Sequence, residues 1–405
     1  MNIRGIPTTS FRRLGLVLII ACIIGARVLY TIYPHTSVNT QVRAITQLCA
    51  ESDNKEDCVA ENIARMIVKN HDVGAALRVI GALYVRDPSF DGQCSNVASA
   101  VAIKTYHLVP DFRSLRLGPE SVYCNYGFVQ SYAREMLLSS KKSGDAKDFC
   151  SYVASSLNAT SPAASAECYR GAGQSLPFID DASLGNPSRM IAFAIRSCEE
   201  MTSVPGELDL CVGGAFNYLD VRQANGEYGL SVEAADPTGI CLEQKPAYRE
   251  ICYGNSKRTV LAAIKPGSES DFAAAMAQMT ARYPHLAEPT LIMAARTLGY
   301  DQSLRSEPSP DYAGIAKQCA ALSPAELRLS CVNGFELGLA KNGPPGLQYL
   351  QLRQFCAAIT RVLGVETGAR CPESSTVDYL KGIYTAGKFS DACKVLGIEK
   401  DQRCL

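Results

Sequence analysis

The stretch Ser197–Leu219, SCEEMTSVPGELDLCVGGAFNYL, places one cysteine on each side of a polar turn. Apolar residues recur at the i, i+3, i+4 and i+7 spacing of a helix face before and after this turn: Ile191, Ala194, Ile195 and Cys198, then Val212, Ala215, Phe216 and Leu219. The spacing predicts two antiparallel helices, with Cys198 ending the first and Cys211 starting the second. At the closed end of such a hairpin, Cα atoms lie within disulfide range, about 5.5 Å apart, so a bond here would lock the two helices together.

The N-terminus combines basic residues with a long apolar segment. Arg4, Arg12 and Arg13 precede residues 14–33, a stretch of 20 residues in which Arg27 is the one charged side chain. This length suits one bilayer crossing, and the basic residues before it predict a cytoplasmic N-terminus and an exported remainder. We therefore expect a single-pass signal anchor, with Arg27 snorkelling to the outer membrane face.

The anchor divides the chain into four expected segments: a basic cytoplasmic N-terminus (1–13), a transmembrane signal anchor (14–33), a linker (34–40) and an extracytoplasmic helical-repeat domain (41–405), periplasmic or extracellular. Two alternatives stay open, namely cleavage of a signal peptide after Ala26 and acylation of Cys22 in the lipobox-like sequence IIAC. The 40 basic and 40 acidic residues cancel, so we expect no nucleic-acid partner.

Cysteine usage favours disulfides. The chain contains 17 cysteines, and 16 remain when Cys22 is set aside. An even number in an exported segment argues for disulfides, whereas a zinc site would want a short CxxC spacing that the chain lacks, so we expect no metal. Sequence does not determine connectivity, but the order of the cysteines suggests eight bonds between neighbours: Cys49 with Cys58, Cys94 with Cys124, Cys150 with Cys168, Cys198 with Cys211, Cys241 with Cys252, Cys319 with Cys331, Cys356 with Cys371, and Cys393 with Cys404.

The second cysteine of each suggested pair recurs with a period near 40 residues. Positions 124, 168, 211 and 252 are separated by 44, 43 and 41 residues, which is typical of arrays of helical hairpins. A glycine follows several of these cysteines: CNYG at 124, CYRG at 168, CVGG at 211, CVNG at 331 and, shifted, CYGN at 252. Glycine inside a helix costs about 1 kcal/mol relative to alanine, so its recurrence indicates close approach of a neighbouring helix, with location in loops as the alternative.

Between Cys252 and Cys331 the period predicts one further unit without cysteines, in residues 271–300. Its two expected apolar faces are Phe272, Ala275, Met276 and Met279, then Leu291, Ala294, Ala295 and Leu298. Each unit cannot bury its own apolar face alone, so stacked neighbours would complete the core.

Cysteine pairs that flank a turn, followed by a CxxG-like start of the second helix, resemble the cysteine-rich Sel1-like repeats, which are related to tetratricopeptide repeats. The stretches HDVGAALRVIGALYVRDPSF (71–90) and YTAGKFSDACKVLG (384–397) also resemble tetratricopeptide helices, and the resemblance extends over residues 41–404. It implies an all-α fold, an α-solenoid of disulfide-locked helical hairpins behind one N-terminal transmembrane helix. The concave or edge surface of such a solenoid binds other proteins or peptides.

No motif for catalysis or cofactor binding is present. The chain has no HExxH, GxSxG, P-loop or EF-hand sequence, and GAGQSL (171–176) lacks the third glycine of a dinucleotide site, so we expect no cofactor. The remaining candidate acids and bases are Asp180 with Asp181, Glu199 with Glu200, His107 and His285. Solvated, capping or packing roles suit these residues better than catalysis.

We therefore predict a binding or scaffolding protein that is anchored in the membrane and holds a protein or peptide partner at the cell envelope. The alternative is an envelope enzyme, such as a cell-wall hydrolase with paired carboxylates in an acidic groove. Tryptophan is absent and 19 tyrosines are available as anchors for a partner. The expected binding residues, or alternatively residues packed between repeats, are Tyr126, Tyr169, Tyr218 and Tyr253.

Overall fold

The computed structural model is all-helical, with no β-strand among the residues that it describes, namely 38–86, 94–232, 238–262, 271–284, 288–305, 311–384 and 386–404. One isolated bridge joins Asp72 to Arg116. Within these ranges, no helix has the length and apolar character needed to cross a bilayer. The expected anchor at 14–33 lies outside them, and helix α2 already begins at Val38, inside the expected linker.

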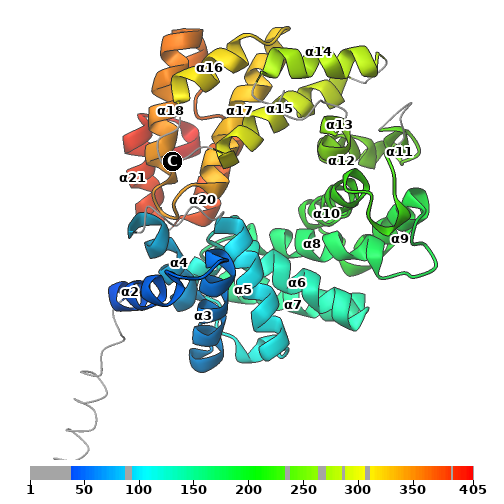
Figure 1. The fold of residues 1–405 in the computed structure, drawn as a ribbon, viewed down its shortest axis with the longest axis vertical. Helices are drawn as coiled ribbons and strands as arrows, with labels where there is room; N and C mark the ends of the chain where they lie inside the picture. The colour runs from blue at the N-terminus through cyan, green and yellow to red at the C-terminus, as the bar shows by residue number, and fades with distance from the viewer. Residues whose placement is uncertain are drawn as a thin grey trace, which may run out of the picture.

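Four helices begin the described chain: α2 (Val38–Cys49), α3 (Lys55–Asn70), α4 (Val73–Arg86) and α5 (Cys94–Leu108). The helices that follow form two layers round a common centre (Figure 1). The inner layer contains α6 (Gly127–Ser140), α8 (Ala164–Ser175), α10 (Pro205–Ala224), α12 (Pro246–Asn255), α13 (Lys257–Leu261), α15 (Glu288–Arg305), α17 (Ala325–Asn342) and α20 (Ser374–Ile383).

The outer layer contains α7 (Ser143–Leu157), α9 (Pro187–Met201), α11 (Gly239–Leu242), α14 (Phe272–Arg282), α16 (Tyr312–Ala320), α18 (Gln348–Leu363), α19 (Val365–Gly368) and α21 (Ala386–Leu396). Short 3-10 helices join some of these elements: η1 (Phe112–Ser114), η2 (Pro119–Val122), η3 (Leu176–Phe178), η4 (Glu227–Gly229) and η5 (Gln402–Cys404). Outer and inner helices alternate along much of the chain, as a succession of hairpins requires.

The hairpin predicted from the opening stretch is present as α9 and α10. Helix α9 buries Ile191, Ala194, Ile195 and Cys198, and α10 buries Val212, Ala215, Phe216 and Leu219. Proline starts both helices, at Pro187 and Pro205, where its missing N–H breaks no helical hydrogen bond. The two predicted apolar faces therefore meet in the core between the layers.

Eight disulfides join the cysteine pairs that the order of the cysteines suggested. They connect Cys49 to Cys58, Cys94 to Cys124, Cys150 to Cys168, Cys198 to Cys211, Cys241 to Cys252, Cys319 to Cys331, Cys356 to Cys371, and Cys393 to Cys404. The Cys198–Cys211 bond ties α9 to α10 with Cα atoms 5.8 Å apart. Most of the bonds thus fasten the two helices of one hairpin.

The unit predicted without cysteines is also a helical hairpin, formed by α14 and α15. Helix α14 buries Phe272, Ala275, Met276 and Met279, and α15 buries Ala294, Ala295 and Leu298 while Leu291 is partly buried. Apolar residues therefore pack this pair together without a disulfide, and it lies next to the disulfide-linked pair α16 and α17.

The recurring glycines allow inner helices to touch backbone to backbone. A Cβ atom on Gly214 of α10 would lie 2.1 Å from the Arg170 carbonyl oxygen of α8, and one on Gly171 would lie 2.1 Å from the Gln130 carbonyl oxygen of α6. Such distances leave no room for a methyl group. Gly127 and Gly334 are similarly close to neighbouring backbone, but Gly254 has no atom within 4 Å, so the expectation of close approach is wrong for the shifted CYGN motif.

The succession of helices curves until its two ends meet, and C-terminal helices lie beside N-terminal ones (Figure 1). The rings of Tyr126 and Tyr379 contact edge to face, with centroids 6.3 Å apart. Ser95 Oγ donates a hydrogen bond of 3.5 Å to Asn342 Oδ1. The inner helices therefore surround the centre of the molecule on all sides of this view.

Candidate functional site

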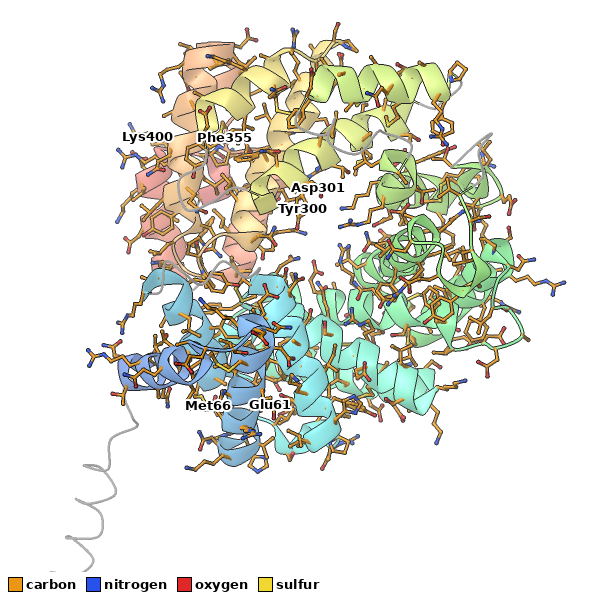
Figure 2. The ribbon with its side chains drawn as sticks, viewed as in Figure 1. Glu61, Met66, Tyr300, Asp301, Phe355 and Lys400 are labelled. Carbon is orange, nitrogen blue, oxygen red and sulfur yellow. A yellow bond between two sulfur atoms is a disulfide. The ribbon has the colours of Figure 1, made fainter. Side chains whose placement is uncertain are left out.

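The inner helices enclose a cavity of about 280 Å³ at the centre of the ring, lined by residues from α6, α8, α10, α12, α13, α15 and α17. Figure 2 shows Tyr300, one of the lining residues, at the inner edge of α15. The lining is mainly polar, although cores of helical proteins are apolar. A polar surface kept at the centre of the fold marks a candidate binding site.

Five amide side chains line this cavity: Asn125, Gln130, Gln174, Asn217 and Asn255. Three of them lie three residues after a recurring glycine, in GFVQ (127–130), GAGQ (171–174) and GAFN (214–217). Residues three apart share one face of a helix. The glycine contact sets how each inner helix packs, and the amide on the same face therefore points toward the centre. The repeated unit thus carries a polar position as well as apolar ones.

Four cationic side chains from four different helices also line the cavity: Arg170 of α8, Lys257 of α13, Arg296 of α15 and Lys341 of α17. Arg170 donates to Glu167 Oε2 over 2.9 Å, and Gln130 Nε2 donates to the same oxygen over 2.8 Å. Arg296 donates to Ser375 Oγ over 3.4 Å. The Glu167 carboxylate therefore compensates Arg170, whereas Arg296 contacts a neutral hydroxyl.

The two lysines face aromatic rings. Lys257 Nζ lies 5.2 Å from the ring centroid of Tyr300, and Lys341 Nζ lies 5.5 Å from that of Tyr379. In the described part of the chain, neither lysine forms an ion pair with a carboxylate. A ring face attracts a cation but leaves its charge uncompensated, so both ammonium groups are available to an anion.

Desolvation lowers the pKa of both lysines. The protein surrounds Lys341 on several sides, and this burial, reinforced by the charges of Arg170, Lys257 and Arg296, lowers its pKa to about 8, although Glu167 acts in the opposite direction. Burial lowers the pKa of Lys257 as well, against the attraction of Asp301 and Asp220. Both groups therefore hold their protons less tightly than ordinary lysines.

Asp220 fixes the position of Lys257. Its buried carboxylate accepts hydrogen bonds from the Arg258 N–H over 2.7 Å and the Thr259 N–H over 2.9 Å at the start of α13. Burial raises the pKa of Asp220, while these hydrogen bonds lower it. The carboxylate caps α13 from α10 and so directs the first residue of α13 toward the cavity.

The structure buries three of the four tyrosines expected to anchor a partner. Tyr126, Tyr169 and Tyr253 are 1%, 5% and 9% exposed, so they pack between helices, as the alternative for these residues held. Tyr218 is partly exposed, but its ring packs edge to face on Phe178 and the Arg222 guanidinium lies 4.5 Å from its centroid. The tyrosines therefore do not form one exposed binding surface.

The candidate acids and bases that belong to the described chain do not line the cavity. Asp181 pairs with Lys141 over 2.9 Å, and Asp180 accepts a hydrogen bond from the Ala182 N–H over 3.2 Å. Glu199 accepts from the Tyr248 hydroxyl over 2.8 Å and pairs with Lys245. His107 lies 3.2 Å from Glu135, Glu200 is exposed, and His285 is outside the described residues.

Among the described residues, Glu336, Cys356 and Cys371 form a group whose ligand atoms lie within 4.8 Å of one another. The two sulfur atoms are bonded to each other, so neither is a thiolate that can bind a metal ion. The Glu336 carboxylate instead accepts a hydrogen bond of 2.7 Å from the Glu373 N–H at the start of α20. This cluster is structural.

Two larger hollows lie away from the centre, with volumes of about 510 and 550 Å³. The larger one lies between α4 and the loop at 345–347. Arg78, which lines it, forms an ion pair with Glu120 over 2.8 Å. The central cavity is smaller, but four cationic side chains line it and one of them, Arg170, is paired with a described carboxylate, which makes this cavity the better candidate for recognition of a ligand.

The comparisons with known proteins do not place this chain in a family: no family model, no curated protein and no solved structure matches it. The cavity itself thus provides the evidence for function. Sequence reasoning missed its residues, although the amide three residues after each recurring glycine was a readable signal.

Proposed function

We propose that this protein is a membrane-anchored helical-repeat scaffold that binds a protein or peptide partner at the cell envelope. In this proposal the disulfide-tied hairpins form an α-solenoid of Sel1-like units behind an N-terminal signal anchor. Eight disulfides support an oxidising compartment outside the cytoplasm, because reducing conditions in the cytosol oppose such bonds.

The central cavity is the main evidence for a binding role. Folding alone favours apolar side chains between packed helices, yet the inner helices direct amides and cations from several repeats to one place. Proteins built from stacked helical units commonly bind partners on the concave surface that the stacking creates. A segment of a partner that enters this cavity would meet rigid hydrogen-bond donors on several helices.

The hydrolase alternative receives less support. A glycosidase needs two carboxyl groups about 5–9 Å apart on either side of the scissile bond. Within the described residues, the cavity lining contains no aspartate or glutamate, and the acidic pairs considered above lie elsewhere. The scaffold role is therefore the one that the arrangement of side chains favours.

Site-specific photo-cross-linking of the full-length protein in its host cells tests the proposal. A photo-reactive residue in place of Asn217, which lines the cavity, should cross-link one defined partner, identified by mass spectrometry. The matched control places the same residue at Lys147, exposed on the outer helix α7. Absence of a cross-link at position 217, or an identical set of products from both positions, would refute the proposed binding role.

A further inference from the structure

Four positive charges converge on the central cavity from positions far apart in the sequence. Arg170, Lys257, Arg296 and Lys341 lie on four different inner helices, and each contributes to the same lining. Because they line one cavity of about 280 Å³, the four charges repel one another, and the fold holds them together against that repulsion. Burial lowers the pKa of Lys341, and the charges of Arg170, Lys257 and Arg296 lower it further.

The negative groups near the cavity do not cancel this charge. Glu167 is engaged by Arg170 and by Gln130, and Asp220 is engaged by the first N–H groups of α13. Asp301 attracts Lys257 without lying within ion-pair distance of it in the described part of the chain. The four cations outnumber the three carboxylates, so an excess of positive charge remains at the cavity.

The neutral groups of the lining are suited to an acceptor-rich ligand. Asn217 and Asn255 provide amide N–H groups, and Arg296 provides a planar guanidinium fork. Two lysines act as point charges, and guanidinium groups match the oxygen pairs of carboxylate and phosphate. A ligand that carries several negative charges on closely spaced oxygens satisfies these donors at once, whereas a single carboxylate leaves most of them unpaired.

We propose that the central cavity is a binding site for a compact, multiply charged oxyanion, with a phosphoryl group as the recognised chemistry. The inference rests on the proposed binding function and names the chemistry that it recognises. Lys257, Arg296 and Lys341 contact the phosphoryl oxygens, and Asn217 and Asn255 donate the remaining hydrogen bonds. Arg170, held by Glu167, closes one side of the site.

Calorimetric titration of the full-length protein in a neutral detergent tests this site with inorganic pyrophosphate as the probe. We expect saturable binding at one site per chain. Lys257→Gln and Lys341→Gln should each weaken the affinity for pyrophosphate by about tenfold or more, because each removes a positive charge that contacts the ligand in a partly desolvated site. Lys341→Arg, which keeps the charge, should retain most of the affinity.

Matched controls remove one positive charge from the outer surface. Lys147→Gln and Lys317→Gln change exposed residues of α7 and α16, so they should leave the affinity for pyrophosphate unchanged. Titration with glycerol 3-phosphate, compared with pyrophosphate, distinguishes a phosphoryl group on a larger molecule from a free anion. Lack of pyrophosphate binding, equal losses in the cavity and control variants, or tighter binding of citrate would overturn the proposal.

The two proposals fail in different ways. If pyrophosphate does not bind but a partner still cross-links at Asn217, the oxyanion assignment is wrong and the scaffold stands. If pyrophosphate binds as expected but no partner cross-links there, the cavity is a small-molecule site and the scaffold role fails.

Discussion

Lys341 illustrates how a single residue can oppose folding at the site it serves. Its ammonium group faces the ring of Tyr379 and three other cations, and desolvation lowers its pKa to about 8 from 10.5. A group whose pKa is lower in the folded protein destabilises the fold while it is protonated in both states. The proposed anionic ligand would compensate this charge and remove the cost.

Lys341→Met should therefore stabilise the protein. Between pH 8 and 10.5 the unfolded chain holds more protons than the folded protein, so the contribution of Lys341 to the free energy of unfolding increases over this range. At pH 7 we expect the variant to be more stable by about 1–2 kcal/mol, less than full desolvation implies because water reaches the cavity. Urea unfolding at pH 7 and pH 10 checks this, and the difference should shrink at the higher pH. A wild-type protein that is the more stable one at pH 7 contradicts the account.

Two glycines that occupy related positions in the sequence differ in their surroundings. Gly214→Ala would put a methyl group 2.1 Å from the Arg170 carbonyl oxygen, so α8 and α10 must separate. We expect a loss of about 3 kcal/mol in the free energy of unfolding. Gly254→Ala, with open space around it, should be neutral or stabilising by less than about 1 kcal/mol. Chemical denaturation measures both, and equal effects would show that the backbone contact at Gly214 is not tight.

At the scale of the element, the hairpin of α9 and α10 combines packed apolar faces with a covalent link. The Cys198–Cys211 bond spans a sequence separation of 13 residues. Closing a loop of this length restricts the unfolded chain and contributes about 3 kcal/mol. The hairpin of α14 and α15 lacks such a bond, so its stability rests on residues such as Phe272 and Met279.

Replacement of both Cys198 and Cys211 by serine should lower the free energy of unfolding by about 3 kcal/mol while leaving the helix content unchanged at 25 °C. Thermal unfolding monitored by circular dichroism provides the measurement. A reducing agent should destabilise the wild-type protein by much more, since it opens all the bonds together. If the reduced protein unfolds at the same temperature as the oxidised one, the bonds have no structural role.

Helical spacing allowed the hairpins to be predicted because it records local burial. The face of Phe272, Ala275, Met276 and Met279 is buried as predicted, in a unit that no cysteine marks. The placement of the tyrosines could not be predicted because ring size and position in a helix do not reveal which face turns inward: Tyr126 packs against Tyr379 where the two ends of the chain meet. Tertiary packing decides that question, and a local pattern does not contain it.

In the whole molecule, the proposed binding site depends on the closure of the described helices round its centre. Asn342 at the end of α17 contacts Ser95 of α5, and Tyr379 of α20 contacts Tyr126 beside α6. The partners in each contact are far apart in sequence, so neither the closure nor the convergence of four cations could be predicted from local spacing. The curvature of the helical array brings lysines and arginines that are far apart in sequence to the lining of one cavity.

If the cavity binds an oxyanion, Lys341 should lower stability in the free protein and raise it in the complex. Thermal unfolding of the wild type and Lys341→Met over increasing pyrophosphate concentration measures both effects. A ligand that binds only the folded state raises its stability by mass action. Without pyrophosphate we expect Lys341→Met to unfold at the higher temperature, and at saturating pyrophosphate we expect the wild type to do so. If Lys341→Met remains the more stable protein at every concentration, or if both proteins gain equally, the proposed oxyanion site is contradicted.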